Sequence, residues 1–353
     1  MNSILSQYHL SHIRKSLESG EEKNLSSFAT ISKRSKGRLH KDNLCDVRTI
    51  FSQDRDRIIH SKYFRRLKHK TQVFLAPIND LLRTRLTHTL EVTQIATTIA
   101  RALNVNRDLT EAIALGHDLG HTPFGHIGEF ILNKLSPFGF HHSIQSLRVV
   151  DKLEKPGGLN LSYEVRDGIL KHSKGGKRLL PFGYPDCPET IEGEIVRVSD
   201  SIAYINHDID DALRSHVIKT TDLPRSCVRL FGARNSQRIS IMVYDIVANS
   251  EKGSHIRMGE KILHETEKLR NFLFQKVYVM PEINSESRKA SKILSELYSY
   301  FMKDPDIPVQ SLCSVEDKNE KKDVVIIDYL ATLTDIEAID LFKRLFEPRR
   351  WAG

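Results

Sequence analysis

The sequence predicts a mostly α-helical protein with a small mixed α/β element in its C-terminal half. Apolar residues recur at steps of three to five positions over long stretches, which is the spacing of amphipathic helices. Glycine and proline separate these stretches, and we find no internal repeat or low-complexity tract. The 353 residues allow two domains, or one large helical domain with appendages.

Composition argues against a membrane protein and favours anionic partners. No run of apolar residues exceeds four, whereas a membrane helix needs about 20 and a signal peptide about 7 to 15. The four cysteines stand 142, 40 and 86 residues apart, which is not a zinc-ribbon spacing, so we expect reduced thiols. Together these features predict a cytoplasmic protein with no membrane partner. The 53 Lys and Arg outnumber 45 Asp and Glu, and the net charge of +8 favours phosphates or nucleic acid as partners.

The N-terminal region is basic. Residues 31–41 lack apolar periodicity, so we expect a surface arm or a solvated linker there. Between Asp54 and Thr71, seven basic residues accompany only two acidic ones. Apolar residues in this segment keep roughly helical spacing, which predicts a basic helix that packs by one face.

Four helices are predicted in the central region. The first covers residues 85–103 by its apolar spacing. The second opens at Asp108, because an acidic residue at Glu111, three positions later, is typical of a helix N-terminus. The third carries residues 127–135, and the fourth runs over about 142–153.

The second half begins with a predicted loop over residues 174–188, which hold three glycines and three prolines. A long helix is expected over 189–215. The span 217–322 is mixed, and strand-like patches at 239–244 and 277–280 predict the small β element.

The C-terminal stretch contains a capping box, since Thr334 is followed three residues later by Glu337, and a helix should begin there. The predicted division of the chain is an N-terminal arm over 1–50, a core with the site over 51–216, a variable α/β region over 217–322 and a C-terminal helix over 323–353.

The positions of two histidines and two aspartates predict a metal site. Adjacent His117 and Asp118 close an apolar helix, where burying a carboxylate costs several kcal/mol unless a cation compensates it. His88 on the preceding helix and Asp200 on the long helix complete a set of two imidazoles and two carboxylates. Such a mixed set suits Mn, Fe, Ni, Co or Mg better than a closed structural zinc site. In the alternative interpretation, His117 and Asp118 merely cap a helix end.

His88 is followed 29 residues later by the pair His117-Asp118, and Asp200 follows that pair by 82 residues. This spacing resembles the metal signature of the HD phosphohydrolases. The flanking segments are similar to the bacterial deoxyguanosine triphosphate triphosphohydrolase family, and the similarity covers residues 54–74, 83–92, 117–129, 198–213 and 328–348. The resemblance implies an HD-domain helical bundle in which His88, His117, Asp118 and Asp200 bind a divalent metal.

The motif around the metal pair also indicates an acid/base pair. Glu129, three residues after His126 on one helix, can accept a hydrogen bond from one imidazole nitrogen and direct the other at the substrate. Outside the motif, such a pair would be structural. His121, one turn after His117, should face the same cavity and bind phosphate or a second metal.

The resemblance further implies a set of substrate-binding residues. It places Arg85 against the triphosphate, Gln72 near the deoxyribose, Tyr204 and Asp208 near phosphate and sugar, and His142 near the phosphates. Arginine suits phosphate oxygens because its guanidinium forms paired hydrogen bonds. For Tyr204 the alternative is an ordinary core aromatic residue.

The implied activity is metal-dependent hydrolysis of a 2′-deoxynucleoside triphosphate, dGTP or another dNTP, to the deoxynucleoside and tripolyphosphate. The resemblance also implies a homo-oligomer, often a hexamer in relatives, and a second site for a dNTP effector. One alternative is an HD phosphohydrolase acting on nucleoside monophosphates or nucleic-acid ends. Another is a protein with a vestigial metal site that binds single-stranded nucleic acid through its basic stretches at 31–41 and 55–70. The sequence lacks the GxxxxGK[ST] phosphate loop, which excludes a phosphate-loop NTPase.

Overall fold

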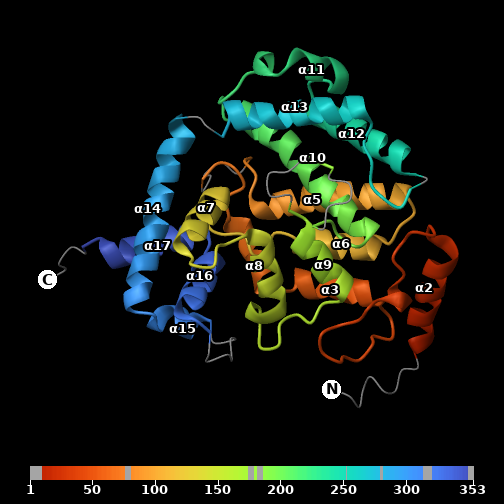
Figure 1. Cartoon of the computed structure of the whole chain (residues 1–353), viewed down its shortest axis with the longest axis horizontal. Helices are drawn as coiled ribbons and strands as arrows, with labels where there is room; N and C mark the ends of the chain where they lie inside the picture. The colour runs from red at the N-terminus through yellow and green to blue at the C-terminus, as the bar shows by residue number, and fades with distance from the viewer. Residues whose placement is uncertain are drawn as a thin grey trace.

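The computed structural model describes residues 10–75, 81–173, 179–180, 186–251, 253–278, 281–312 and 320–348, and Figure 1 shows helices joined by loops. Within these ranges there is no β-strand, only two isolated bridges, Arg38 with Ser162 and Thr71 with Thr84. The predicted mostly α fold is therefore confirmed.

The core of the bundle surrounds one long helix, α10 (Ile191–Arg214), which is buried along most of its length. It packs against α5 (Arg85–Ala102) and α6 (Arg107–Gly116), while α3 (Ile50–Ile59) and α9 (Tyr163–Lys171) pack on α6. Buried apolar side chains of these helices form one continuous hydrophobic cluster. The helices predicted over 85–103 and 189–215 thus correspond to α5 and α10, which lie side by side.

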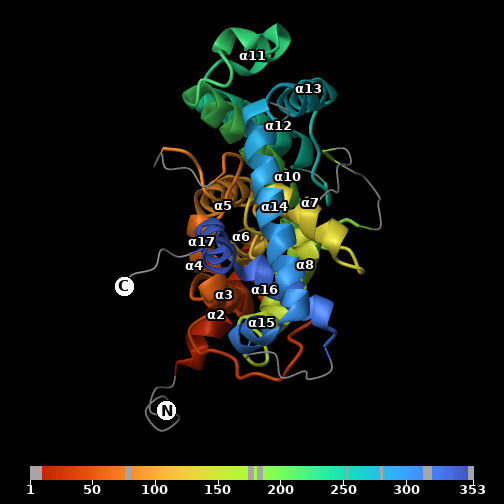
Figure 2. The ribbon, with the colours of Figure 1, turned by 90° about the vertical axis from the view of Figure 1, so that its left-hand side faces the viewer.

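A second hydrophobic cluster joins the middle of the chain to its C-terminal part. It contains buried residues of α7 (Gly125–Leu135), α14 (Pro281–Lys303), α16 (Lys322–Thr332) and α17 (Asp335–Phe346). Figure 2 shows α14 running along the molecule beside α7 and α16. The helix that directly follows the His117-Asp118 pair is consequently packed against the C-terminal helices.

The remaining helices are peripheral or short. They are α2 (Ser11–Asn24), α4 (Lys62–Arg66), α8 (His142–Arg148) with its π-helical continuation (Val149–Leu153), α11 (Arg225–Phe231), α12 (Asn235–Ser250), α13 (Glu260–Lys276) and α15 (Asp306–Ser311). In Figure 1, α11, α12 and α13 gather at one end of the molecule, above α10.

The predicted α/β element is wrong for the residues that the structure describes. Residues 239–244 lie within α12, because Met242 and Ile246, one helical turn apart, bury the same face against the bundle. The β-branched residues of this segment predicted a strand, but tertiary packing overrides such a local preference and makes the segment helical. Val277 is the C-cap of α13, and Met280 lies outside the described residues.

Two helix starts differ from the prediction. Asn106, and not Asp108, caps α6, since its side chain accepts a hydrogen bond from the backbone N–H of Leu109 at 3.2 Å. The predicted basic helix is broken in two because the Ser61 side chain accepts from the backbone N–H of Phe64 at 3.1 Å and starts α4.

Other elements agree with the sequence. The capping box of α17 is confirmed, because Thr334 Oγ1 accepts from the Glu337 N–H at 3.2 Å and the Glu337 carboxylate accepts from the Thr334 N–H at 2.8 Å. The basic arm over 31–41 holds only a short 3-10 turn, Ser32–Arg34. Of the predicted loop, residues 174–178 and 181–185 lie outside the described residues. None of the described helices is both long and apolar enough to cross a membrane.

Candidate active site and metal centre

Three of the predicted metal ligands converge in the middle of the bundle. His88 projects from α5, and His117 and Asp118 follow α6 directly. The Oδ2 atom of Asp118 lies 3.8 Å from Nε2 of His88 and 3.5 Å from Nε2 of His117, and all three residues are buried. Asp200 on α10 stands beside this group, with its Oδ1 3.3 Å from Nε2 of His88. Packing of three helices therefore assembles the four residues that the sequence grouped.

The donor atoms of this group fit a divalent cation. Nδ1 of His117 lies 2.6 Å from the carbonyl oxygen of Ala114, so that nitrogen donates and Nε2 is left with its lone pair. Nε2 is buried without a hydrogen-bond partner and faces the Asp118 carboxylate. A metal ion would satisfy this orphaned nitrogen, and orientation of a ligand imidazole through its other nitrogen is typical of metal sites.

The electrostatics agree with this assignment. Burial lowers the pKa of His88, which keeps its imidazole in the neutral form that binds metals. Burial alone would raise the pKa of Asp118, but the neighbouring His117 and Arg85 hold it well below its ordinary value. Asp118 is therefore an anion at neutral pH.

A chain of side chains behind His88 includes one histidine that the sequence analysis missed. Nε2 of His207 lies 2.7 Å from Nδ1 of His88, and Nδ1 of His207 lies 2.7 Å from Oδ1 of Asp208. The hydroxyl of Tyr278 donates to Oδ2 of Asp208. Asp208, assigned to substrate by resemblance, thus lies between His207 and the end of α13. His207 follows Tyr204 by three positions on the same helix, and this helical spacing was the sequence signal that could have indicated His207.

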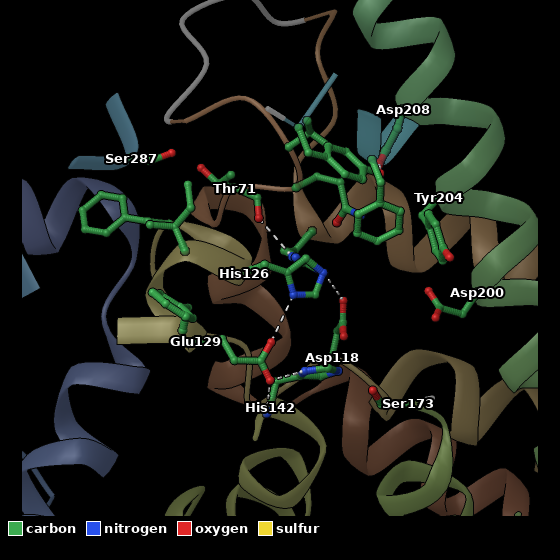
Figure 3. A pocket seen from close by; sticks show the side chains of 18 of the residues that line it. Thr71, Asp118, His126, Glu129, His142, Ser173, Asp200, Tyr204, Asp208 and Ser287 are labelled. Carbon is green, nitrogen blue, oxygen red and sulfur yellow. Dashed lines mark hydrogen bonds and ion pairs between the residues drawn. The ribbon is translucent and has the colours of Figure 1, made fainter. Parts of the chain in front are cut away.

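His126 and Glu129 form a pair in the first turns of α7, and Figure 3 shows them at one wall of a cavity. Nδ1 of His126 lies 3.0 Å from one carboxylate oxygen of Glu129. The other oxygen accepts from the backbone N–H of His142 at 2.9 Å and lies 2.8 Å from its Nδ1. The His126 side chain is 71% exposed, whereas Glu129 and His142 are largely buried. One carboxylate therefore orients two imidazoles.

The surroundings of Glu129 strongly favour the ionised form of its carboxyl group. Burial would raise the pKa of Glu129, but the charge of His142 and hydrogen bonds from His126 and His142 lower it far below its ordinary value. Glu129 consequently stays ionised and can stabilise a protonated imidazole beside it.

Two further histidines lie under this pair. His121 is fully buried, both of its ring nitrogens lack a hydrogen-bond partner, and its ring stacks on that of His142 with centroids 4.9 Å apart. His172, which the sequence analysis did not select, follows α9; its Nε2 lies 3.1 Å from Nε2 of His142 and 3.9 Å from Oδ1 of Asp118. Burial and the nearby His117 lower the pKa of His172 to about 3. Its lone position before a loop offered no sequence signal.

Arg85 and Gln72 reach the same region from the other side. Arg85 is buried, with Nη1 donating to Oδ2 of Asp118 at 2.9 Å and Nε donating to the carbonyl of Thr71 at 3.0 Å. Its Nη2 has no hydrogen-bond partner, and neither has the buried Oε1 of Gln72. Each side chain thus keeps one polar atom available for a ligand.

These residues surround a cavity of about 1400 Å³ (Figure 3). The predicted residues that line it are Gln72, Arg85, Asp118, His126, Glu129, His142, Asp200, Tyr204 and Asp208. His88, His117 and His121 belong to the buried groups described above and are not part of its lining. The C-terminal helices contribute a wall that the sequence did not predict: Arg270, Asn271, Phe274 and Tyr278 from α13 and its end, and Ser287, Arg288 and Ser291 from α14.

Comparison with known proteins identifies the family. The HD-domain model matches residues 85–205, and the phosphohydrolase-associated domain model matches residues 256–344. Several curated relatives bear the name deoxyguanosinetriphosphate triphosphohydrolase-like protein. That of Caldanaerobacter subterraneus is 50% identical over 96% of this chain and 97% of its own. Those of Desulfatibacillum aliphaticivorans and Clostridium tetani are 49% and 43% identical, covering 95% and 96% of this chain and 98% and 97% of theirs. The chain belongs to the deoxyguanosinetriphosphate triphosphohydrolase-like family.

The two matched regions of the chain divide the candidate site. The HD-domain region contains the four candidate metal ligands and the His126-Glu129 pair. The phosphohydrolase-associated region contains the wall contributed by α13 and α14. The protein is accordingly an HD-domain hydrolase whose cavity is completed by α13 and α14.

Proposed function

We propose that the protein is a metal-dependent dNTP triphosphohydrolase, which converts a 2′-deoxynucleoside triphosphate, dGTP or another dNTP, to the deoxynucleoside and tripolyphosphate. The observation that carries this proposal is the orphaned buried Nε2 of His117 beside Asp118, because Asp118 lines the same cavity as the His126-Glu129 pair. The names of the relatives support a nucleoside triphosphate as the substrate class.

His88, His117, Asp118 and Asp200 would hold the divalent ion, which is Mn, Mg, Fe, Ni or Co by the chemistry of the donors. When bound, such an ion polarises a phosphate oxygen and lowers the pKa of the attacking water. The neutral His88 and the anionic Asp118 are already in the protonation states that metal binding requires.

The His126-Glu129 pair would move the proton. Glu129 engages Nδ1 of His126, which leaves Nε2 of this exposed imidazole to face a ligand. His126 would donate a proton to the leaving 5′ oxygen or accept one from the water. The ionised Glu129 would stabilise the imidazolium, which favours the charged form of His126 during the reaction.

The remaining cavity residues would bind the nucleotide. Nη2 of Arg85 is available to an α-, β- or γ-phosphate oxygen and would balance negative charge in the transition state. We assign His142 to the phosphates as well, and His121 to the phosphates or to a second metal. Gln72, Tyr204 and Asp208 would contact the deoxyribose, where a closely packed tyrosine leaves no room for a 2′-hydroxyl.

Product analysis tests this function. Each of the four dNTPs is incubated with Mn or Mg, with ATP and GTP as ribonucleotide controls, and the products are separated by chromatography. Deoxynucleoside with intact tripolyphosphate is the expected result. Release of pyrophosphate or single phosphate would contradict it, and phosphate release from nucleoside monophosphates or nucleic-acid ends would favour the alternative HD phosphohydrolase.

We further propose a cytoplasmic homo-oligomer, such as a hexamer, with a second site for a dNTP effector. Exposed apolar side chains on and between α7 and α8, namely Phe130, Phe138 and Ile144, support self-association. Molar mass from light scattering tests the homo-oligomer, and a monomer would contradict it. The proposed division into 1–50, 51–216, 217–322 and 323–353 is tested by limited proteolysis.

Single-stranded nucleic acid is a second candidate partner, which the basic segments 31–41 and 55–70 favour. Binding that weakens steeply with salt would support it. A protein that binds nucleic acid but hydrolyses no nucleotide would support the vestigial metal site instead.

A further inference from the structure

A buried carboxylate at the start of α17 makes hydrogen bonds far from its own helix. Asp335 is 1% exposed, and Thr334 with Glu337 already forms the cap of α17. The Asp335 carboxylate instead accepts the backbone N–H of Phe124 at 2.8 Å and the backbone N–H of Thr71 at 3.0 Å, and it also accepts the Thr71 hydroxyl. Three donors from two distant loops thus converge on one side chain of the C-terminal region.

Phe124 is the N-cap residue of α7, and its backbone conformation is unusual. Its φ of +62° and the φ of +59° at Gly125 place two consecutive residues in the left-handed region, which non-glycine residues rarely adopt. Surrounding contacts must hold such a backbone in place. A Cβ atom on Gly125 would lie 3.3 Å from the Thr71 carbonyl and 3.5 Å from the Gln72 carbonyl, so α7 starts directly on that segment. His126 is the next residue.

Lys70 makes a second connection between the same regions. It is 1% exposed, and its Nζ donates to the carbonyl of His121 and, at 2.7 Å, to the carbonyl of Ala331 in α16. The backbone carbonyl of Lys70 accepts the N–H of Arg85 at 3.0 Å. The loop before α7, the Lys70-Thr71 segment and the C-terminal helices are therefore connected through buried polar contacts. Neither Lys70 nor Asp335 lines the cavity.

We propose that Asp335 is a positioning residue, which holds the start of α7 against the Thr71-Gln72 segment and so places the His126 imidazole toward the cavity. The C-terminal helices then act on the reaction through two backbone N–H groups and a hydroxyl rather than through contact with the substrate. This inference rests on the role of His126 in the proposed function.

The experiment compares Asp335→Asn with Asp54→Asn in the full chain. Asp54 is also a buried carboxylate, and it binds Arg38 and the backbone N–H of Ser162, away from the cavity. Both substitutions preserve the shape of a buried carboxylate, and Asp54→Asn also breaks the ion pair with Arg38, so it is the more severe control for loss of stability. At position 335 the new amide NH₂ would face a donor, so at least one bond to Thr71 or Phe124 is lost.

Proton NMR of the histidine side chains reports the positioning without any substrate. The His126 resonances, assigned with His126→Ala, are compared with those of His255, an exposed histidine that pairs with Glu194 at 2.8 Å in another part of the molecule. Asp335→Asn should shift the His126 resonances, leave those of His255 in place and retain metal. It should lower dNTP turnover by about tenfold or more, since small misplacements of a reacting group have large effects on rate, while Asp54→Asn stays within about threefold of the parent.

Unchanged His126 resonances in Asp335→Asn, or equal losses of turnover in the two asparagine variants, would overturn the proposal. A parent protein that hydrolyses no dNTP would contradict the proposed function alone, because the resonances still decide the positioning. If Asp335→Asn fails to fold, Thr71→Val, which replaces the hydroxyl donor by a methyl group, is measured for the His126 resonances alone, since Thr71 also lines the cavity. The resonances should shift in Thr71→Val, and Thr71→Ser should keep those of the parent.

Discussion

At the residue scale, the site depends on which nitrogen of each histidine is already engaged. Nδ1 of His117 donates to a backbone carbonyl, so only Nε2 faces the Asp118 carboxylate. Nδ1 of His126 faces Glu129, so only Nε2 faces the cavity. In the proposed function the same residue type would thus serve two tasks, metal binding in the first case and proton transfer in the second.

Substitution of a ligand should remove metal and activity together. We expect His88→Ala and Asp118→Ala each to abolish tripolyphosphate release, because an incomplete donor set holds the ion poorly. Elemental analysis of the purified variants checks this result, with Asp54→Ala as the control for loss of a buried carboxylate. Stoichiometric metal in either ligand variant would exclude that residue from the metal site.

The acid/base pair makes a different prediction. His126→Ala should retain metal and bind dNTP while its rate falls by about 10² to 10⁴, the range for a positioned proton-transfer group. Glu129→Gln should lose less, because it keeps a hydrogen-bond acceptor, and the two losses should be non-additive since they disable one unit. Turnover and melting temperature are measured on the same samples. A lowered melting temperature with turnover within about threefold of the parent would indicate a purely structural pair.

At the element scale, α7 and α8 are joined by one carboxylate. Glu129 on α7 accepts from the backbone N–H of His142, the first residue of α8, at 2.9 Å. It therefore stabilises the junction of two helices as well as orienting His126. Hydrogen bonds to a charged group contribute about 1.5 to 3 kcal/mol each, so this junction should be sensitive to the charge of Glu129.

That charge predicts a pH dependence of stability. Since the folded pKa of Glu129 is depressed, its contribution is present above the unfolded value, near 4.5, and is lost as the pH falls below it. Urea unfolding of the parent and of Glu129→Gln at several pH values between 7 and 3.5 tests this. The parent should be the more stable at pH 7, and the difference should shrink in acid. A difference that stays constant over this range would show that the charge contributes nothing.

At the scale of the whole molecule, the cavity belongs to two parts of the chain. Its lining runs from Thr71 to Ser291, and it includes residues of α5 and α10, which contribute to the first hydrophobic cluster, and of α7 and α14, which contribute to the second. Arg270 and Phe274 on α13 face the same space as Tyr204 on α10. Packing of the C-terminal helices on the bundle thus completes an enclosure that neither part forms alone.

Sugar discrimination should depend on this enclosure. We expect hydrolysis of dGTP to exceed that of GTP, since Tyr204 and Gln72 line the cavity where the sugar would lie. Tyr204→Ala should raise the relative rate on GTP, whereas metal content stays at the parent level. Rates with both nucleotides, measured beside the exposed control Tyr244→Ala, check this. Equal rates of the parent protein on dGTP and GTP would refute the assignment.

The sequence by itself determined the helical class, the capping box at Thr334 and the grouping of His88, His117, Asp118 and Asp200. Helical periodicity and capping involve residues three or four positions apart, so they are visible in any short window. Only the tertiary structure revealed the contacts of His172 and Asp335. Their partners lie far away in the chain, and contacts of that kind depend on how helices pack rather than on a local pattern. Residues 239–244 show the same limit, because their burial against the bundle, and not their β-branched composition, made them helical.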